Sequence, residues 1–281
     1  MADFDALLTR TDPDRRLAAL FAEPDVRARL FTLYAFYHEI ARVPDTVSES
    51  VIGEMRLAWA REAVEDLYAN PAKVRRHDVY EALAALKDLP GAPAKEALVG
   101  LVEARAADLG QGPFPNAEDR RDYIDRTAGA LIQCAARLAE PNLDLSEAAE
   151  DALRAAGRAW GYAGLIRAFP DLCHAGRPPL TKAEVEDYTL TETDLARGLK
   201  PDLASVATRQ LYVEAYHALA AWRDARAALP ASVFPAVGYL ALTKGYLKPA
   251  ARLSDPYRER VERPLALRQL HLTWASLTGR I

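Results

Sequence analysis

The sequence predicts an all-α protein, and three observations support this fold class. Alanine, leucine, arginine and glutamate fill most stretches of the chain, and these residues are strong helix formers. Helix-start signals recur, whereas the alternating apolar pattern of strands is nearly absent. Half of the 281 residues are hydrophobic, which is enough to fill a large core. We therefore expect one large helical bundle.

The expected helices follow one another with short breaks. Asp12-Pro13 and Asp255-Pro256 each place a capping carboxylate before a proline at the first helical position. Ser146 stands before an acidic first turn, where the helix dipole favours negative charge. We expect helices near residues 13–22, 24–43, 47–70, 77–88, 93–110, 117–139, 146–168, 181–188, 201–229, 233–248 and 256–277.

The longest expected helix runs from about Pro201 to Leu229. Small and apolar residues recur there at alternating steps of four and three, which predicts one buried face on a helix about 40 Å long. The residues of this face are Ala204, Thr208, Leu211, Ala215, Ala218, Trp222, Ala225 and Leu229.

The breaks between the helices are short and rich in proline and glycine. They read PGAP at residues 90–93, GQGP at 110–113 and AGRPP at 175–179. None has the length or composition of a flexible linker, and no internal repeat is present. We expect a single domain over residues 1–281.

Charge and cysteine content exclude several classes of protein. The net charge of −4 does not indicate a nucleic-acid partner. Two lone cysteines, Cys134 and Cys173, indicate reduced thiols rather than a disulfide scaffold. The acidic start MADFDALL is unlike a signal peptide, and no apolar run has the length of a membrane span. A cytoplasmic location is expected.

The C-terminal segment differs in charge from the rest of the chain. From Lys244 to Ile281 there are eight Lys and Arg against three Asp and Glu, a net charge of +5. This charge has two possible explanations. The segment is a solvated basic face, or it contacts an acidic partner or the inner membrane surface. An apolar helical face lies within this basic segment and consists of Leu267, Leu270, Trp274 and Leu277. We expect this face to close the bundle, and docking on a membrane or a partner is the alternative. All four tryptophans, at positions 59, 160, 222 and 274, are expected in the core.

An acidic pair follows the helix expected at residues 24–43. Asp45 and Glu49 are four residues apart and would share one helical face. Two such carboxylates can hold Mg²⁺, which can hold a diphosphate, and Arg42 could meet the same anion. The spacing alone is common on solvated helices, so a metal role needs other support.

Longer motifs supply that support as a resemblance. YAFYHEIARVPDTVSE (residues 34–49) and GEMRLAWAREAVED (53–66) resemble the squalene/phytoene synthase family of head-to-head prenyl transferases. In that family an arginine stands three residues before a D-x-x-x-D motif that binds Mg²⁺-diphosphate. Arg42, Asp45 and Glu49 fall on those positions, with glutamate replacing the last aspartate. Pro44 departs from the pattern.

The resemblance continues over roughly residues 13–250 and implies an isoprenoid-synthase bundle around a central cavity. DYIDRTAGALIQCAARL (122–138) is similar to the family's Y-C-x-Y-V-A-G-x-V-G segment, with Tyr123, Ala128 and Gly129 matching. The second tyrosine, used near the cleaved diphosphate, falls on Arg126. A phenol is replaced there by a permanent cation.

The third motif has lost its acidic residues. The family has N-I-x-R-D-x-x-E-D and then G-R-x-Y-L-P, whereas residues 160–184 read WGYAGLIRAFPDLCHAGRPPLTKAE. Gly176, Arg177 and Leu180 keep the trailing element, which makes Arg177 a candidate for diphosphate binding. Of the second metal motif, Asp171 alone remains.

These departures imply a degenerate active site. The overall pattern most resembles a subgroup that includes the mitochondrial assembly factor for respiratory complex I. We therefore expect a non-catalytic protein with a partner in respiratory-complex biogenesis. We expect it to retain a cavity that binds an isoprenoid or a diphosphate, with Mg²⁺ as the candidate cofactor. The alternative is an active Mg²⁺-dependent prenyl transferase making presqualene diphosphate, squalene or phytoene. A lipid-carrying or phosphatase-like role that uses one metal cluster is a third hypothesis.

Overall fold

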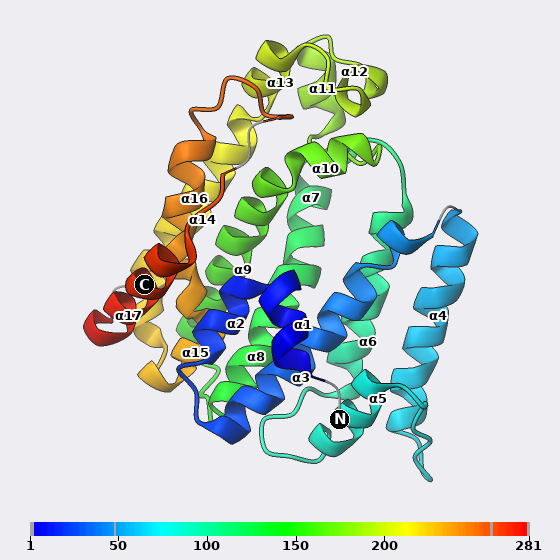
Figure 1. Cartoon of the computed structure of the whole chain (residues 1–281), viewed down its shortest axis with the longest axis vertical. Coiled ribbons are helices and arrows are strands. Elements are labelled where there is room, and N and C mark those ends of the chain that lie inside the picture. The colour runs from blue at the N-terminus through cyan, green and yellow to red at the C-terminus, as the bar shows by residue number, and fades with distance from the viewer. Residues whose placement is uncertain (1–2, 48, 259–260, 280–281) are drawn as a thin grey trace.

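The computed structural model describes residues 3–47, 49–258 and 261–279, and this part of the chain is an all-α bundle, as predicted (Figure 1). In chain order its α-helices are α1 (Phe4–Thr11), α2 (Pro13–Ala19), α3 (Pro24–Ala41), α4 (Ser50–Leu67), α5 (Asp78–Leu86), α6 (Lys95–Ala104), α7 (Ala117–Ile124), α8 (Ala130–Ala139), α9 (Glu147–Arg167), α10 (Phe169–His174), α11 (Lys182–Asp187), α12 (Glu192–Ala196), α13 (Pro201–Ala207), α14 (Arg209–Ala225), α15 (Phe234–Val237), α16 (Thr243–Ala250) and α17 (Leu265–Thr278). Six shorter turns of 3₁₀ or π type connect them: η1 (Pro44–Thr46), η2 (Arg105–Leu109), the π segment η3 (Asp125–Gly129), η4 (Arg226–Ala228), η5 (Ala231–Val233) and η6 (Gly238–Leu242).

Helix α9 forms the centre of the bundle and packs against α14, α16 and η3. Its small residues permit close approach. A Cβ atom on Gly157 would lie 2.5 Å from the Cα atom of Gly129, so side chains are excluded where α9 meets η3. The capping serine predicted at its start is confirmed, because Ser146 Oγ accepts a hydrogen bond from Ala149 N at 3.4 Å.

A second, smaller hydrophobic cluster lies at one end of the molecule. Helices α11, α12 and α13 gather there, at the top of Figure 1, next to α10. The buried members of this cluster are Phe169, Cys173, Leu180, Val185, Leu190, Leu195, Ala204 and Ala207.

Several predicted helices differ from the observed ones. The helix expected over residues 233–248 is divided into η5, α15, η6 and α16, and α1, α10 and α12 were not expected. The helix expected over residues 201–229 is interrupted at Thr208, between α13 and α14, and Thr208 Oγ1 donates to the carbonyl of Ser205 at 2.8 Å. The helix expected from residue 256 begins at Leu265 instead. Asp255 caps only a turn, since its carboxylate accepts from the backbone N–H groups of Tyr257 and Arg258.

The last helix closes on the first part of the chain. Helix α17 packs against η6 and α2, and its Arg268 donates to the buried carboxylate of Asp14 at 2.9 Å. Tyr246 Oη donates to the same carboxylate at 2.8 Å, and Arg167 lies 3.4 Å from it. Three donors thus compensate the desolvation of one buried acid.

Candidate functional site

The predicted acidic pair does not lie on one helix. Helix α3 ends at Ala41, Asp45 lies in the turn η1, and Glu49 stands at the N-cap of α4 with an extended backbone (φ −127°, ψ 134°). The expectation of a shared helical face is therefore wrong. Pro44 explains the difference, because a proline cannot donate the backbone hydrogen bond that would continue α3. Ser48, within the same motif, lies outside the described residues.

The Asp45 carboxylate lies beside a cation. Its side chain is 72% exposed and accepts a hydrogen bond at 3.3 Å from Arg177. Arg177 also donates to the carbonyl of Asp108 at 2.9 Å. Arg42 is half-exposed and pairs with Glu39 at 3.3 Å. The structure therefore brings together two predicted site residues, Asp45 and Arg177. They form an ion pair with each other.

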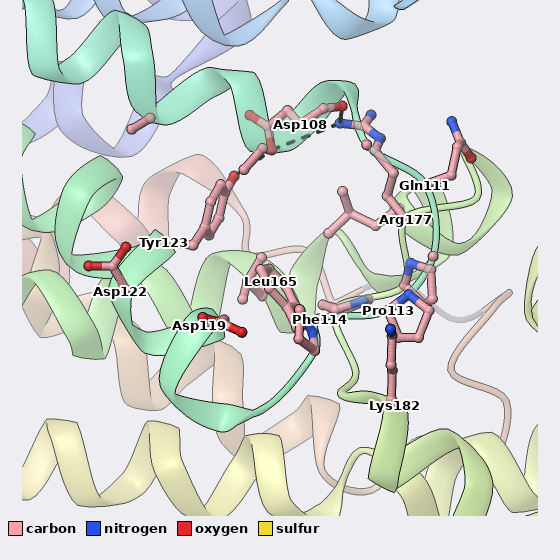
Figure 2. A pocket seen from close by; sticks show the side chains of 18 of the residues that line it. Asp108, Gln111, Pro113, Phe114, Asp119, Asp122, Tyr123, Leu165, Arg177 and Lys182 are labelled. Carbon is pink, nitrogen blue, oxygen red and sulfur yellow. Dashed lines mark hydrogen bonds and ion pairs between the residues drawn. The ribbon is translucent and has the colours of Figure 1, made fainter.

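Arg177 lies in a hollow of about 410 Å³ (Figure 2). Two loops pair along it: Gly112 N donates to the carbonyl of Gly176 at 2.8 Å, and Phe114 N to that of Leu180 at 2.8 Å. Both glycines have positive φ angles, +85° and +73°, which other residues rarely adopt. The retained glycine before Arg177 therefore has a conformational role in this wall.

A buried polar network forms one edge of this hollow. Figure 2 shows Tyr123 directed at Asp108, and its hydroxyl donates to that carboxylate at 2.8 Å. Arg105 donates to both, at 2.8 Å to Asp108 and 3.1 Å to Tyr123. The Arg105 guanidinium also lies 4.5 Å from the ring centroid of Tyr37. Burial raises the pKa of the Tyr123 phenol well above its ordinary value, so this phenol remains protonated.

Sequence reasoning missed Arg105 and Asp108. Their only local signal is opposite charge at a spacing of three, which is common on exposed helices. The resemblance identified Tyr123, but nothing in the sequence showed that η2 brings two further charged groups to it.

Arg126 and Lys182 add charge to the lining of the same hollow. Arg126 is half-exposed and lies 3.7 Å from Asp122. Figure 2 shows Lys182 and Asp119 on the side of the hollow away from Asp108. The lining therefore mixes cations and carboxylates, and it is not a uniformly cationic surface for a diphosphate.

The one remnant of the second metal motif, Asp171, does not line the hollow that holds Arg177. Asp171 lines a separate hollow with His174, Arg197 and Arg258. Glu184 is held by the fully buried Arg120 through contacts of 2.7 and 2.9 Å, and it also closes the capping box of α11. These carboxylates are used elsewhere in the fold.

Asp45 and Glu49 do not share the helical face on which the expected magnesium site was based. Within the described ranges, no group of three or more His, Cys, Asp or Glu side chains lies close enough to hold a metal ion. Mg²⁺ requires oxygen ligands in near-octahedral geometry, and Asp45 has a guanidinium as its neighbour. A metal role for Asp45 and Glu49 stays a prediction, and we derive no chemical step through it.

The interior between α2, α3, α9 and η6 is filled by a buried arginine. Arg15 lies 5.3–6.0 Å from the centroids of four aromatic rings, and its Nη1 atom donates to Asp12 at 2.7 Å. Burial opposes its charge, but Asp12 and the neighbouring phenols raise its pKa well above the ordinary value. The four rings are those of Tyr34, Tyr37, Trp160 and Tyr239.

The fold matches solved structures of isoprenoid synthases. A dehydrosqualene synthase in complex with ligand superposes with a TM-score of 0.78 at 14% identity, covering 98% of this chain and 94% of that one. The squalene synthase HpnC from Alicyclobacillus acidocaldarius gives a TM-score of 0.73 at 20% identity, covering 90% and 94%. The class defined by the fold is therefore the all-α bundle of isoprenoid-synthase type.

Within this class, the squalene/phytoene synthase family model matches residues 8–270, and the chain belongs to that family. Human "NADH dehydrogenase (ubiquinone) complex I, assembly factor 6" is 25% identical over 292 residues, covering 95% of this chain and 78% of that protein. Its bovine counterpart is also 25% identical, over 266 residues, covering 86% and 71%. The family predicted from the motifs is thus confirmed.

Proposed function

We propose that this protein acts in the assembly of respiratory complex I, the NADH dehydrogenase, and that it does not catalyse prenyl transfer. The observation that carries the proposal is that Asp171, the one remnant of the second metal motif, lines a hollow separate from the one that holds Arg177, the ion-pair partner of Asp45. The similarity to complex I assembly factors supports the assembly role.

The physical argument concerns the charge that develops in the family reaction. Ionising an allylic diphosphate leaves a highly charged anion, which metal ions held from opposed helices must neutralise. Here Arg177 is engaged with Asp45 and Asp108, and Glu184 is engaged with Arg120. Ionisation would lack most of its electrostatic support. A protein partner in complex I biogenesis would then use the scaffold as a binding surface.

Deletion of the gene in its host tests the assembly role. We expect less assembled complex I and less NADH-dependent respiration, with unchanged C30 and C40 isoprenoids. Re-expression of the wild-type protein and of Asp45→Ala should both restore complex I, because the proposal gives Asp45 no catalytic task. Normal complex I in a clean deletion strain would contradict the proposal.

The retained Arg42, Asp45 and Glu49 favour a second candidate, an active Mg²⁺-dependent prenyl transferase. Purified protein would be incubated with Mg²⁺ and farnesyl or geranylgeranyl diphosphate, with and without NADPH. We expect no C30 or C40 product. A product that disappears in Asp45→Ala would establish the enzyme and overturn our assignment.

We also propose that the hollow beside Arg177 still binds a diphosphate or isoprenoid diphosphate, without a chemical step. Arg177, Arg126 and Lys182 supply the cations. Pyrophosphate should raise the melting temperature of the wild type and raise that of Arg177→Gln much less. An equal rise in both proteins would place the anion elsewhere.

The proposed location is the cytoplasm, at the inner membrane surface where complex I is assembled. No helix in the described part of the chain combines the length and apolarity needed to cross a bilayer. Any membrane contact through the basic C-terminal segment is therefore proposed as peripheral.

A further inference from the structure

Helix α17 carries two apolar faces, and only one of them is covered. On the inner face Leu272 and Ala275 are buried, and Arg268 reaches Asp14. On the outer face four large side chains are exposed by 50–79%, so the expectation that they close the bundle is wrong. These residues are Leu267, Leu270, Trp274 and Leu277.

The outer face forms one continuous stripe. Its residues are spaced by three, four and three, which at 100° per residue confines them to about 80° of the helix circumference. The helix has 14 residues and is about 21 Å long. Figure 1 shows α17 at the edge of the bundle, where it packs against η6 and α2.

Two further apolar side chains are exposed on the turn that follows α2, which lies next to α17. A hollow of about 260 Å³ between the two helices is lined in part by Leu20, Phe21 and Thr273. Leu20 and Phe21 are themselves 36% and 40% exposed. Four large apolar side chains exposed along one helical stripe indicate contact with another apolar phase.

Arginines lie near both ends of the outer face. Residues 263–281 contain no acidic residue, and of the described arginines in this segment Arg268 is engaged with Asp14 on the inner face. Arg263 lies 3.1 Å from His271, on the flank of the outer face, and Arg226 binds the carbonyl of Gly279 at its far end. Cations therefore flank both ends of the apolar stripe.

We propose that α17 docks on an anionic phospholipid surface, lying in the plane of the interface with Leu267, Leu270, Trp274 and Leu277 inserted. An exposed apolar face flanked by arginines, with a tryptophan within it, is the pattern of interfacial helices. Acidic headgroups complement the charge. Dimerisation through the same face is less favourable, because it would place the basic segments of the two copies against each other. The inference deepens the proposed function, since it gives the protein its site at the membrane.

Flotation with purified protein tests this without complex I. Vesicles of phosphatidylcholine with phosphatidylglycerol should bind the protein at low salt, vesicles of phosphatidylcholine alone should bind it much less, and added NaCl should weaken binding. Leu270→Ser/Leu277→Ser should reduce the affinity about tenfold or more, because two inserted side chains are lost. Val51→Ser/Met55→Ser is the matched control, since those side chains are 59% and 67% exposed on α4. This pair should bind as the wild type does.

Tryptophan quenching identifies the inserted helix directly. In a Trp59→Phe background, Trp160 and Trp222 are buried and Trp274 is exposed, so brominated lipid should quench Trp274 alone. No binding to anionic vesicles, equal loss in both variant pairs, or no quenching would overturn the proposal. So would a dimer in solution that the α17 variants dissociate. Because the assay contains only protein and lipid, its failure is distinct from a failure of the complex I experiment.

Discussion

Arg15 shows how one side chain changes the interior of this fold. It is 6% exposed, surrounded by aromatic rings, and paired with Asp12. A buried cation requires such partners, because the low-dielectric interior otherwise disfavours charge. A permanent cation and four rings are packed together between α2, α3, α9 and η6. This packing gives Arg15 a structural role.

Replacement of Arg15 tests this role. Arg15→Ala removes the partner of Asp12 and the contacts with the rings, so unfolding free energy should fall by about 3 kcal/mol. Arg16→Ala, the adjacent control, breaks an exposed pair with Asp5 and should cost about 1 kcal/mol or less. Urea denaturation of both variants measures the difference. Equal losses would show that Arg15 is not a structural centre.

Asp45 and Arg177 show which features of the candidate site could be predicted from the sequence. The resemblance selected both residues, and the structure brings them together. Their direct pairing joins positions 132 residues apart, and no local pattern reports a contact of that separation. The same limit applies to Glu184, which is held by buried Arg120 across a separation of 64 residues. Motifs identified candidates, while their partners depended on tertiary packing.

At the scale of elements, two glycines of α9 differ in whether the packing of the helix requires them. Gly157→Ala would place a Cβ atom 2.5 Å from Gly129 Cα, so we expect a loss of about 1–3 kcal/mol. Gly164, on the same helix, has no such neighbour within 4 Å. Gly164→Ala should stabilise by about 0.5–1 kcal/mol through helix propensity. Melting temperatures that move in opposite directions would confirm the distinction; a loss in both would contradict it.

Elements were predicted best where local signals and packing agree. Residues 117–139 were expected as one helix, and α7, η3 and α8 follow without a gap, with the π turn placed where α9 packs. The helix at 201–229 broke because α13 belongs to the second hydrophobic cluster and α14 to the main core. Sequence periodicity runs through Thr208 unchanged, so it could not show that the two halves face different neighbours.

At the scale of the molecule, the two cysteines report on the two hydrophobic clusters. Cys134 lies in the main core and Cys173 in the smaller cluster, and both are free and buried. Burial raises the pKa of Cys134 to about 12 and that of Cys173 well above its ordinary value. Both thiols should therefore resist alkylation in the native protein at neutral pH.

Alkylation in increasing urea, followed by mass spectrometry, tests whether the clusters open together. We expect Cys173 to be modified at lower urea than Cys134, since the smaller cluster buries fewer apolar residues. Coincident modification would instead indicate one cooperative unit. Modification of either thiol without denaturant would contradict its burial.

The contact between Asp14 and Arg268 also has a consequence for protein synthesis. The two residues are separated by 254 positions, so translation makes the acid near the beginning and its guanidinium partner near the end. While the chain is still emerging from the ribosome, this early carboxylate lacks one of its three donors. The N-terminal region therefore cannot reach its final state until the last helix has been released, and a prematurely terminated chain would leave that defect for proteases to recognise.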